Sequence, residues 1–190
     1  MRLMTRSFLM LLGLGLGAPV FSQSIPLGEI VGSDRSIRDP LYKVTARYPT
    51  DWVVRGVTRW GDRETTIFLG EPAVSVTAWL YYRFPLDHRP IPDLEAYLRE
   101  AAKKKTQQRI EGGLADYAIV ADSFSFRLVG ELPALSYVAG FTVSSTTYRE
   151  YFVRVLSSKG EALFFLRAPL EQFEPLRAAF ETMVESVRLP

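Results

Sequence analysis

The chain has 190 residues, with 23 basic and 21 acidic side chains, a single histidine and no cysteine. This composition excludes a disulfide framework, and it argues against zinc or copper sites, which draw on several His and Cys ligands. The nearly balanced charge gives no electrostatic reason to bind nucleic acid or an anionic membrane surface.

The N-terminus has the pattern of a secretory signal peptide. Arg2 and Arg6 precede an apolar run from Phe8 to Leu16, and small residues then lead to a cleavage site after Ser22. The run is too short to span a bilayer, and no later stretch is as apolar. Because the chain has no cysteine for a lipid anchor, we expect a periplasmic or secreted protein, not a lipoprotein and without an integral membrane segment.

Residues 23–190 are enough for about one domain with a hydrophobic core. Residues 23–40 mix Gly, Pro, Ser and charge without periodicity, which predicts a flexible leader before a single domain over 41–190. Alternation over 41–48 predicts a strand, and Pro49 begins a turn into a second strand. Tyr48 and Trp52 are expected to anchor this hairpin in the core.

The rest of the chain predicts strands, one helix, more strands and a closing helix. The first helix follows Asp93, a favourable N-cap, and ends at Gly112-Gly113. The last helix carries an apolar stripe from Phe173 to Val187. Strands are predicted at 65–69, 74–84, 117–129, 135–144, 148–157 and 161–167. Short links between the later strands imply antiparallel hairpins, so the fold class is α+β, an antiparallel sheet flanked by helices.

Two ends of the chain resemble the PsbP-like family. They read Tyr42-x-Val44 with Tyr48-Pro49-x-x-Trp52, and Phe180-x-x-Met183-Val184-x-Ser186-Val187-Arg188. The resemblance implies an α/β/α sandwich over 41–190, the fold of the extrinsic photosystem II subunit and of the small Ran-binding import factor. It indicates an exported bacterial-type member of unassigned role, and we do not infer photosynthesis from it. These motifs are structural, so the family implies a binding or scaffolding part, with no cofactor and no catalytic residue to transfer.

Candidate catalytic motifs have simpler structural explanations. Asp87-His88 could pair as in a catalytic triad, but the chain lacks a G-x-S-x-G nucleophile, which favours an exposed loop histidine. Gly112-Gly113 follows a helix, whereas phosphate-binding loops precede one. The acids at 62, 64, 87, 111 and 116 form no recognisable pair. We therefore expect no enzyme, no metal and no cofactor.

A basic segment lies in the C-terminal half of the first predicted helix. Lys103-Lys104-Lys105 and Arg109 could dock an acidic partner, but cations in this half of a helix also favour its dipole. A solvated helix face is the favoured interpretation.

The strand at 74–84 has one face that is both aromatic and polar. Trp79, Tyr81 and Arg83 lie on it, and His88 follows in the Pro-rich link. If the helices leave this face open, it suits a protein, peptide or glycan partner; otherwise these residues belong to the core.

Two functions follow from this reading. The favoured one is a non-catalytic accessory or scaffolding domain that binds an envelope or secreted protein, or a polymer. The alternative is a small-molecule-binding or hydrolytic domain with a pocket between sheet and helix. No sequence feature indicates an oligomeric state.

Overall fold

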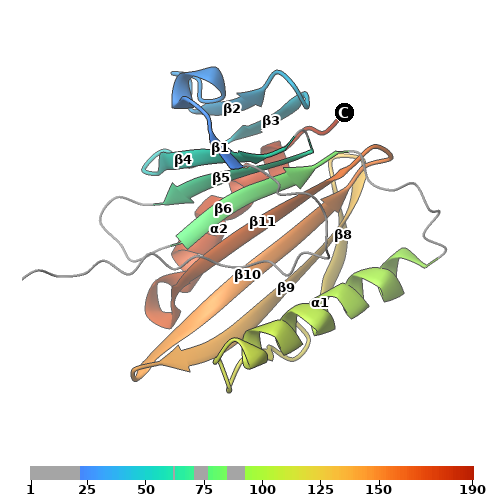
Figure 1. Ribbon diagram of the computed structural model, residues 1–190. Helices are drawn as coiled ribbons and strands as arrows, with labels where there is room; N and C mark the ends of the chain where they lie inside the picture. The colour runs from blue at the N-terminus through green and yellow to red at the C-terminus, as the bar shows by residue number, and fades with distance from the viewer. Residues whose placement is uncertain (1–21, 62, 71–76, 85–92) are drawn as a thin grey trace, which may run out of the picture.

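The computed structural model describes residues 22–61, 63–70, 77–84 and 93–190, and it has the predicted α+β architecture (Figure 1). The predicted signal peptide, apart from Ser22, lies outside these residues, as does His88. In chain order the elements are β1 (Ser22–Ser24), the 3-10 turn η1 (Leu27–Glu29), β2 (Ser36–Asp39), β3 (Val44–Arg47), β4 (Val53–Trp60), β5 (Glu64–Gly70), β6 (Thr77–Arg83), α1 (Leu94–Glu111), β7 (Ala118–Ile119), β8 (Ser125–Val129), β9 (Leu132–Val143), β10 (Thr146–Leu156), β11 (Glu161–Pro169) and α2 (Leu170–Ser186).

The main sheet is antiparallel throughout its pairings. Its strands run in the order β1-β4-β5-β6-β11-β10-β9, and both β7 and β8 pair with the outer edge of β9. The β9–β10 hairpin turns through Ser144 and Ser145, which have φ of 47° and 68°. Positive φ at both central residues is the geometry whose twist matches a two-residue hairpin. A separate two-stranded sheet is formed by β2 and β3.

Helix α2 and the β2–β3 hairpin cover one face of the sheet. Phe180 on α2 lies 5.6 Å from the Trp52 ring and 6.2 Å from the Phe164 ring, measured between centroids. Trp52 is buried, and Tyr48 packs partly buried against the same core. Both residues therefore lie in or against the core as predicted, but the hairpin that they were expected to anchor does not form, because β3 pairs with β2 whereas β4 pairs with β1 and β5.

The flexible leader predicted over 23–40 is corrected by the structure. β1 pairs with Thr58–Trp60 of β4, and β2 pairs with β3. Ile30 is 2% exposed and Ile37 is 0% exposed, so both belong to the core. The partner of β1 is distant in sequence, so a local pattern does not show that pairing, whereas β2 forms a short hairpin with β3.

Helix α1 lies on the opposite face, beside β9 and β8 (Figure 1). Asp93 caps it as predicted, accepting a hydrogen bond from the Ala96 N–H at 2.9 Å. The helix ends at Gly112, and Gly113 has φ of 98°. Within the described residues, neither helix is long and apolar enough to span a bilayer.

One predicted strand is divided. The sequence suggests a single strand over 117–129, but a turn after Val120 separates β7 from β8. Ser123 holds this turn to the sheet: its hydroxyl accepts from the Val138 N–H at 3.1 Å. Both short strands pair with β9, so the break changes the sheet edge and not the topology.

Candidate functional site

The predicted site residues of β6 lie on the sheet face opposite α2. Ala78, Leu80 and Tyr82 alternate into the α2 core, which turns Trp79, Tyr81 and Arg83 to the other side. The strand register sets Phe68 of β5 opposite Trp79, and Thr66 opposite Tyr81. Further along, Trp60 of β4 pairs with Glu64. We call Trp60, Phe68, Trp79 and Tyr81 the aromatic face.

The four residues of the aromatic face differ in exposure. Phe68 is 42% exposed and Trp60 is 41% exposed, high values for rings of this size. Trp79 is half-buried and stacks on Phe165, with ring centroids 4.9 Å apart and planes 19° apart. Tyr81 is also half-buried, and desolvation raises its pKa, so its hydroxyl stays protonated. Trp79 thus anchors the face while Phe68 and Trp60 project from it.

Arg83 is engaged within the fold. Its Nη2 donates to the buried Glu161 at 2.8 Å, and Glu161 also accepts from Arg154 Nε at 2.7 Å. The cationic group that the sequence placed beside the aromatic rings is therefore shared with an internal carboxylate. His88, the remaining predicted site residue, lies outside the described part of the chain.

A second buried acid lies on the same sheet face. Glu150 accepts from Tyr117 Oη at 2.8 Å and from Arg167 Nε at 2.8 Å, and Arg109 Nη2 lies 3.4 Å away. Desolvation raises the pKa of Tyr117, which keeps its hydroxyl a donor. Glu150 and Glu161 are thus both occupied by donors from the protein itself.

Sequence reasoning missed Lys105. We interpreted the 103–105 run and Arg109 as a solvated face. Lys103 is indeed exposed, 3.9 Å from Glu100, but Arg109 is buried and lies 3.4 Å from Glu150. The Lys105 Nζ instead lies 5.2 Å from the Phe152 ring centroid and 5.8 Å from that of Trp79. The spacing held a signal: Lys105 lies seven residues after Leu98 and three after Ala102, on the buried stripe of α1.

Lys105 borders a small cavity between α1 and the sheet, of about 100 Å³. Its polar lining groups are Lys105, Arg154 and Tyr137, whose ring stacks on Phe152 at 4.9 Å. Among the described residues, neither the Lys105 ammonium nor the Tyr137 hydroxyl has a hydrogen-bond or ion-pair partner. The remaining lining is apolar: Trp79, Leu98, Ala101, Ala102, Leu135, Phe152, Val153 and Leu163.

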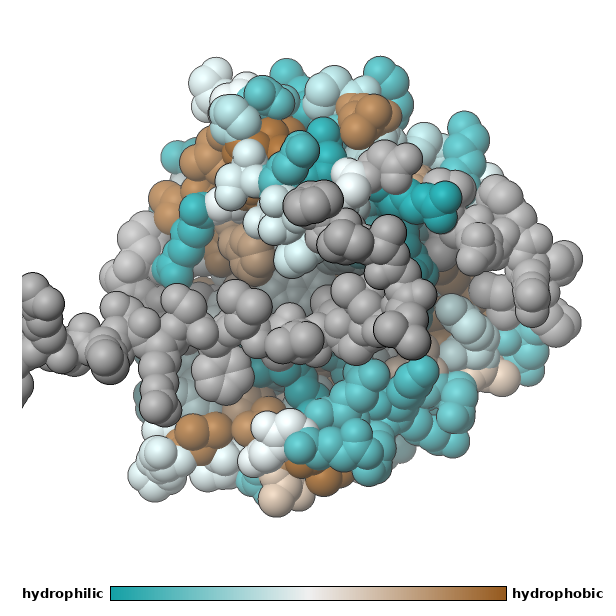
Figure 2. All heavy atoms as spheres, in the orientation of Figure 1, coloured by the Kyte–Doolittle hydropathy of each residue, from teal (hydrophilic) through white to brown (hydrophobic). Residues whose placement is uncertain are grey.

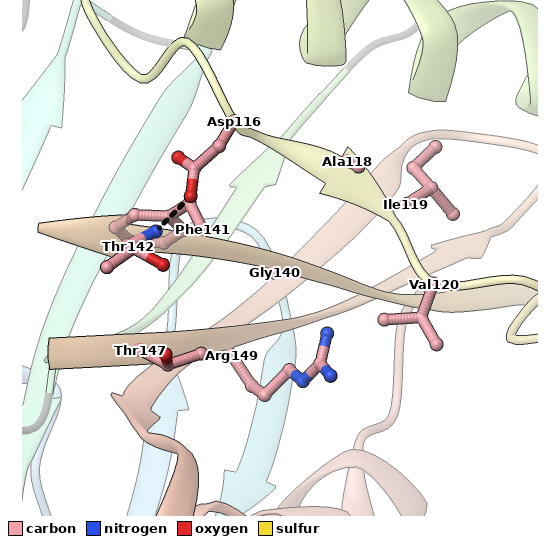
Figure 3. A pocket seen from close by; sticks show the side chains of 9 residues that line it. All are labelled: Asp116, Ala118, Ile119, Val120, Gly140, Phe141, Thr142, Thr147 and Arg149. Atoms are coloured by element: carbon pink, nitrogen blue, oxygen red, sulfur yellow. Dashed lines mark hydrogen bonds between the residues drawn. The ribbon is translucent and has the colours of Figure 1, made fainter. Parts of the chain in front are cut away.

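A larger hollow lies at the β7 edge of the sheet (Figure 3). It measures about 310 Å³ but is shallow. Asp116 accepts from the Thr142 N–H at 2.9 Å, and the Arg149 guanidinium lies across the backbone of Gly140, where a Cβ would meet its Nη1 at 2.3 Å. Arg149 lies apart from Asp116 in this view, so the hollow offers no convergent polar set.

The described residues contain no group of three His, Asp or Glu side chains placed to hold a metal ion. The outer surface of α1 is hydrophilic (Figure 2). The described groups that distinguish this face are therefore the aromatic rings and the cation beneath α1.

Comparison with known proteins identifies the fold. No family model and no curated protein matches the chain. Among solved structures, cyanobacterial PsbP from Synechocystis sp. PCC 6803 matches with a TM-score of 0.55 and 11% identity, over 95% of this chain and 99% of that one. The chain therefore has the PsbP-like fold, as its two end motifs predicted.

Two further structures match less closely. LpqN, involved in cell envelope biogenesis of Mycobacterium tuberculosis, has a TM-score of 0.49 at 12% identity, over 90% of this chain and 92% of that one. The immunity protein TplEi of Pseudomonas aeruginosa has a TM-score of 0.46 at 12% identity, over 70% of this chain and 45% of that one.

Proposed function

We propose that this chain is a non-catalytic exported domain that binds an envelope or secreted protein through its aromatic face. The observation that carries the proposal is the cross-strand pair Phe68–Trp79, in which Trp79 is fixed by stacking while Phe68 stays 42% exposed. A rigid aromatic anchor beside a projecting ring is the arrangement that interface hot spots favour.

The coverage of the sheet supports the same choice. α1 packs over β9, β10 and β11 through Leu98, Ala102 and their neighbours, and it meets β6 at Trp79. Among the described residues, no helix covers Trp60 and Phe68 on β4 and β5. These strands therefore show two large exposed rings, Phe68 and Trp60, on a side that also carries Thr58, Thr66 and Glu64.

The polar groups support binding over catalysis. Glu150 and Glu161 are each held by arginine side chains, and the larger hollow lacks a convergent set of polar groups. The PsbP-like fold agrees with a binding part, by analogy of fold alone. Export rests on the signal-peptide pattern, which is a prediction from sequence.

The test is affinity capture from envelope extract with residues 22–190 and two variants. Phe68→Ser removes the projecting ring from a position that is 42% exposed. Leu41→Ser is the matched control, since Leu41 is 56% exposed and lies outside the aromatic face. We expect one or more proteins, identified by mass spectrometry, to fall at least about tenfold with Phe68→Ser and to be unchanged with Leu41→Ser.

Equal capture by the two variants would exclude the aromatic face as the binding surface. Adding cell-wall glycan to the extract tests for a polymer partner. The glycan would displace the captured protein only if it bound the same rings of the aromatic face.

A further inference from the structure

Lys105 is a cation in a largely apolar setting, and the nearby carboxylate of Glu150 is already engaged by Arg167 and Tyr117. Its Nζ is flanked by the Trp79 and Phe152 rings, and it has no ion-pair partner in the described chain. Removing an ammonium from water is unfavourable unless new interactions replace its hydration. Cation–π contacts supply only part of that replacement. An entering anion would supply the rest.

The neighbouring polar groups favour the same kind of ligand. The Tyr137 hydroxyl can donate, and the Arg154 guanidinium borders the cavity while it also donates to Glu161. Burial raises the pKa of Tyr137, so its proton is retained. All three groups are donors, whereas the rest of the lining is aliphatic or aromatic. The complementary ligand has an acceptor head and a short apolar body.

The cavity volume limits the size of that body. About 100 Å³ is two-thirds of an engineered apolar cavity of about 150 Å³ that admits benzene. By the same proportion the cavity encloses about four of benzene's six non-hydrogen atoms, so a carboxylate and the carbon atom next to it fit inside and the rest of the chain must extend outside.

We propose that the cavity between α1 and the sheet binds a carboxylate on a short aliphatic chain, with Lys105 as its ion partner. The carboxylate has two sources of the same chemistry: a free short-chain monocarboxylic acid, or a glutamate side chain or C-terminus of a protein bound at the aromatic face. Trp79 belongs to both surfaces, so the second source rests on the proposed function and the first does not.

The charges around Lys105 give the expected pH dependence. It is faced by Arg109 on its own helix, by Glu150 and Arg154 on β10, by Arg167 on β11 and by Tyr137 on β9. Desolvation, followed by repulsion from Arg109, lowers the pKa of Lys105 to about 8. Below that pH the ammonium is present to bind the anion. As pH rises through about 8 in the free protein, the proton is lost and affinity falls.

The first experiment is an isothermal titration of sodium butyrate into residues 22–190 at about pH 6.5 and about pH 9.5. Lys105→Met keeps the length of the side chain and removes its charge. Lys104→Met removes the same charge from an exposed position on the same helix, and butyramide is the uncharged ligand control. We expect butyrate to bind at the lower pH, with affinity at least tenfold weaker in Lys105→Met, unchanged in Lys104→Met and weaker at the higher pH.

A structural readout accompanies the titration. Butyrate should raise the Lys105 pKa followed by NMR of the side-chain Nζ, and circular dichroism checks that Lys105→Met is folded. The proposal would be overturned if butyrate bound Lys105→Met as tightly as the unaltered protein. It would also be overturned if butyramide bound the unaltered protein as tightly as butyrate.

The second source is tested in the capture experiment. If butyrate fails to bind up to about 100 mM while Lys105→Met, but not Lys104→Met, loses the captured protein, the carboxylate comes from the partner. If neither butyrate nor capture depends on Lys105, the carboxylate site is refuted. If capture is then lost in Phe68→Ser but kept in Lys105→Met, the proposed function is supported without the carboxylate site.

Discussion

At the scale of single residues, buried acids connect α1 to the sheet. Glu150 on β10 accepts hydrogen bonds from Tyr117 and Arg167 and lies 3.4 Å from Arg109 of α1. These donors come from the segment before β7, from β11 and from the helix. A buried carboxylate with several donors fixes the position of each, because moving any one of them leaves charge without a partner.

Replacing Glu150 with glutamine should therefore be costly although the two side chains have nearly the same shape. Arg167 and Arg109 would lose their anion, and we expect the free energy of unfolding to fall by about 3 kcal/mol. Urea denaturation followed by tryptophan fluorescence measures it. Glu181→Gln is the control at a half-exposed carboxylate. A loss below about 1 kcal/mol for Glu150→Gln would show that the network adds little stability.

Sequence analysis correctly placed the residues whose position follows from the spacing within one strand or one helix. Alternation placed Trp79 and Tyr81 on the face opposite the α2 core, and helical spacing placed Phe180 on the covering stripe. The ion pair of Arg83 with Glu161 joins β6 to β11 and has no local signature. Lys105 was assigned to solvent because cations in the C-terminal half of a helix favour its dipole without any partner, although Lys105 continues the buried stripe.

At the scale of elements, α1 has a hydrophilic outer surface and rests on a narrow inner stripe. Leu98 packs with Leu135 and Leu156, and Ala102 packs against the aromatic rings further along the sheet. A helix held by so few apolar side chains depends more than most on its ends. Asp93 caps the N-terminal end of α1 by accepting a hydrogen bond from the Ala96 N–H.

We expect Asp93→Ala to lower the free energy of unfolding by about 1 kcal/mol, because the Ala96 N–H loses its cap. Asp93→Asn should retain most of the stability, since asparagine caps about as well. Thermal unfolding by circular dichroism compares the two. The same melting temperature for Asp93→Ala and Asp93→Asn would contradict a capping role.

At the scale of the whole molecule, the N-terminal residues complete the sheet. β1 covers the edge of β4, the Ile25 N–H donates to the Val57 carbonyl at 3.2 Å, and Ile30 enters the core. Edge strands without such a cover are prone to pair with other chains. Residues 22–31 therefore act as part of the fold and as protection for its edge.

Deleting residues 22–31 should lower the free energy of unfolding by at least about 2 kcal/mol, the value of burying one large aliphatic side chain. It should also promote aggregation through the exposed β4 edge. Chemical denaturation and light scattering compare this deletion with a chain that begins at Ser22. Equal stability of the two chains would show that residues 22–31 do not stabilise the fold and form only a leader.

The β2–β3 hairpin is also bound to the far end of the chain. Thr45 and Arg188 exchange backbone hydrogen bonds of 3.1 and 2.8 Å, and the Arg47 N–H donates to Ser186 Oγ at 2.7 Å. Contacts across such sequence distances form late, because a long loop must close first. As the chain is synthesised, the early hairpin must therefore wait until the last helix has emerged. Until then Trp52 lacks Phe180, the ring on which it stacks.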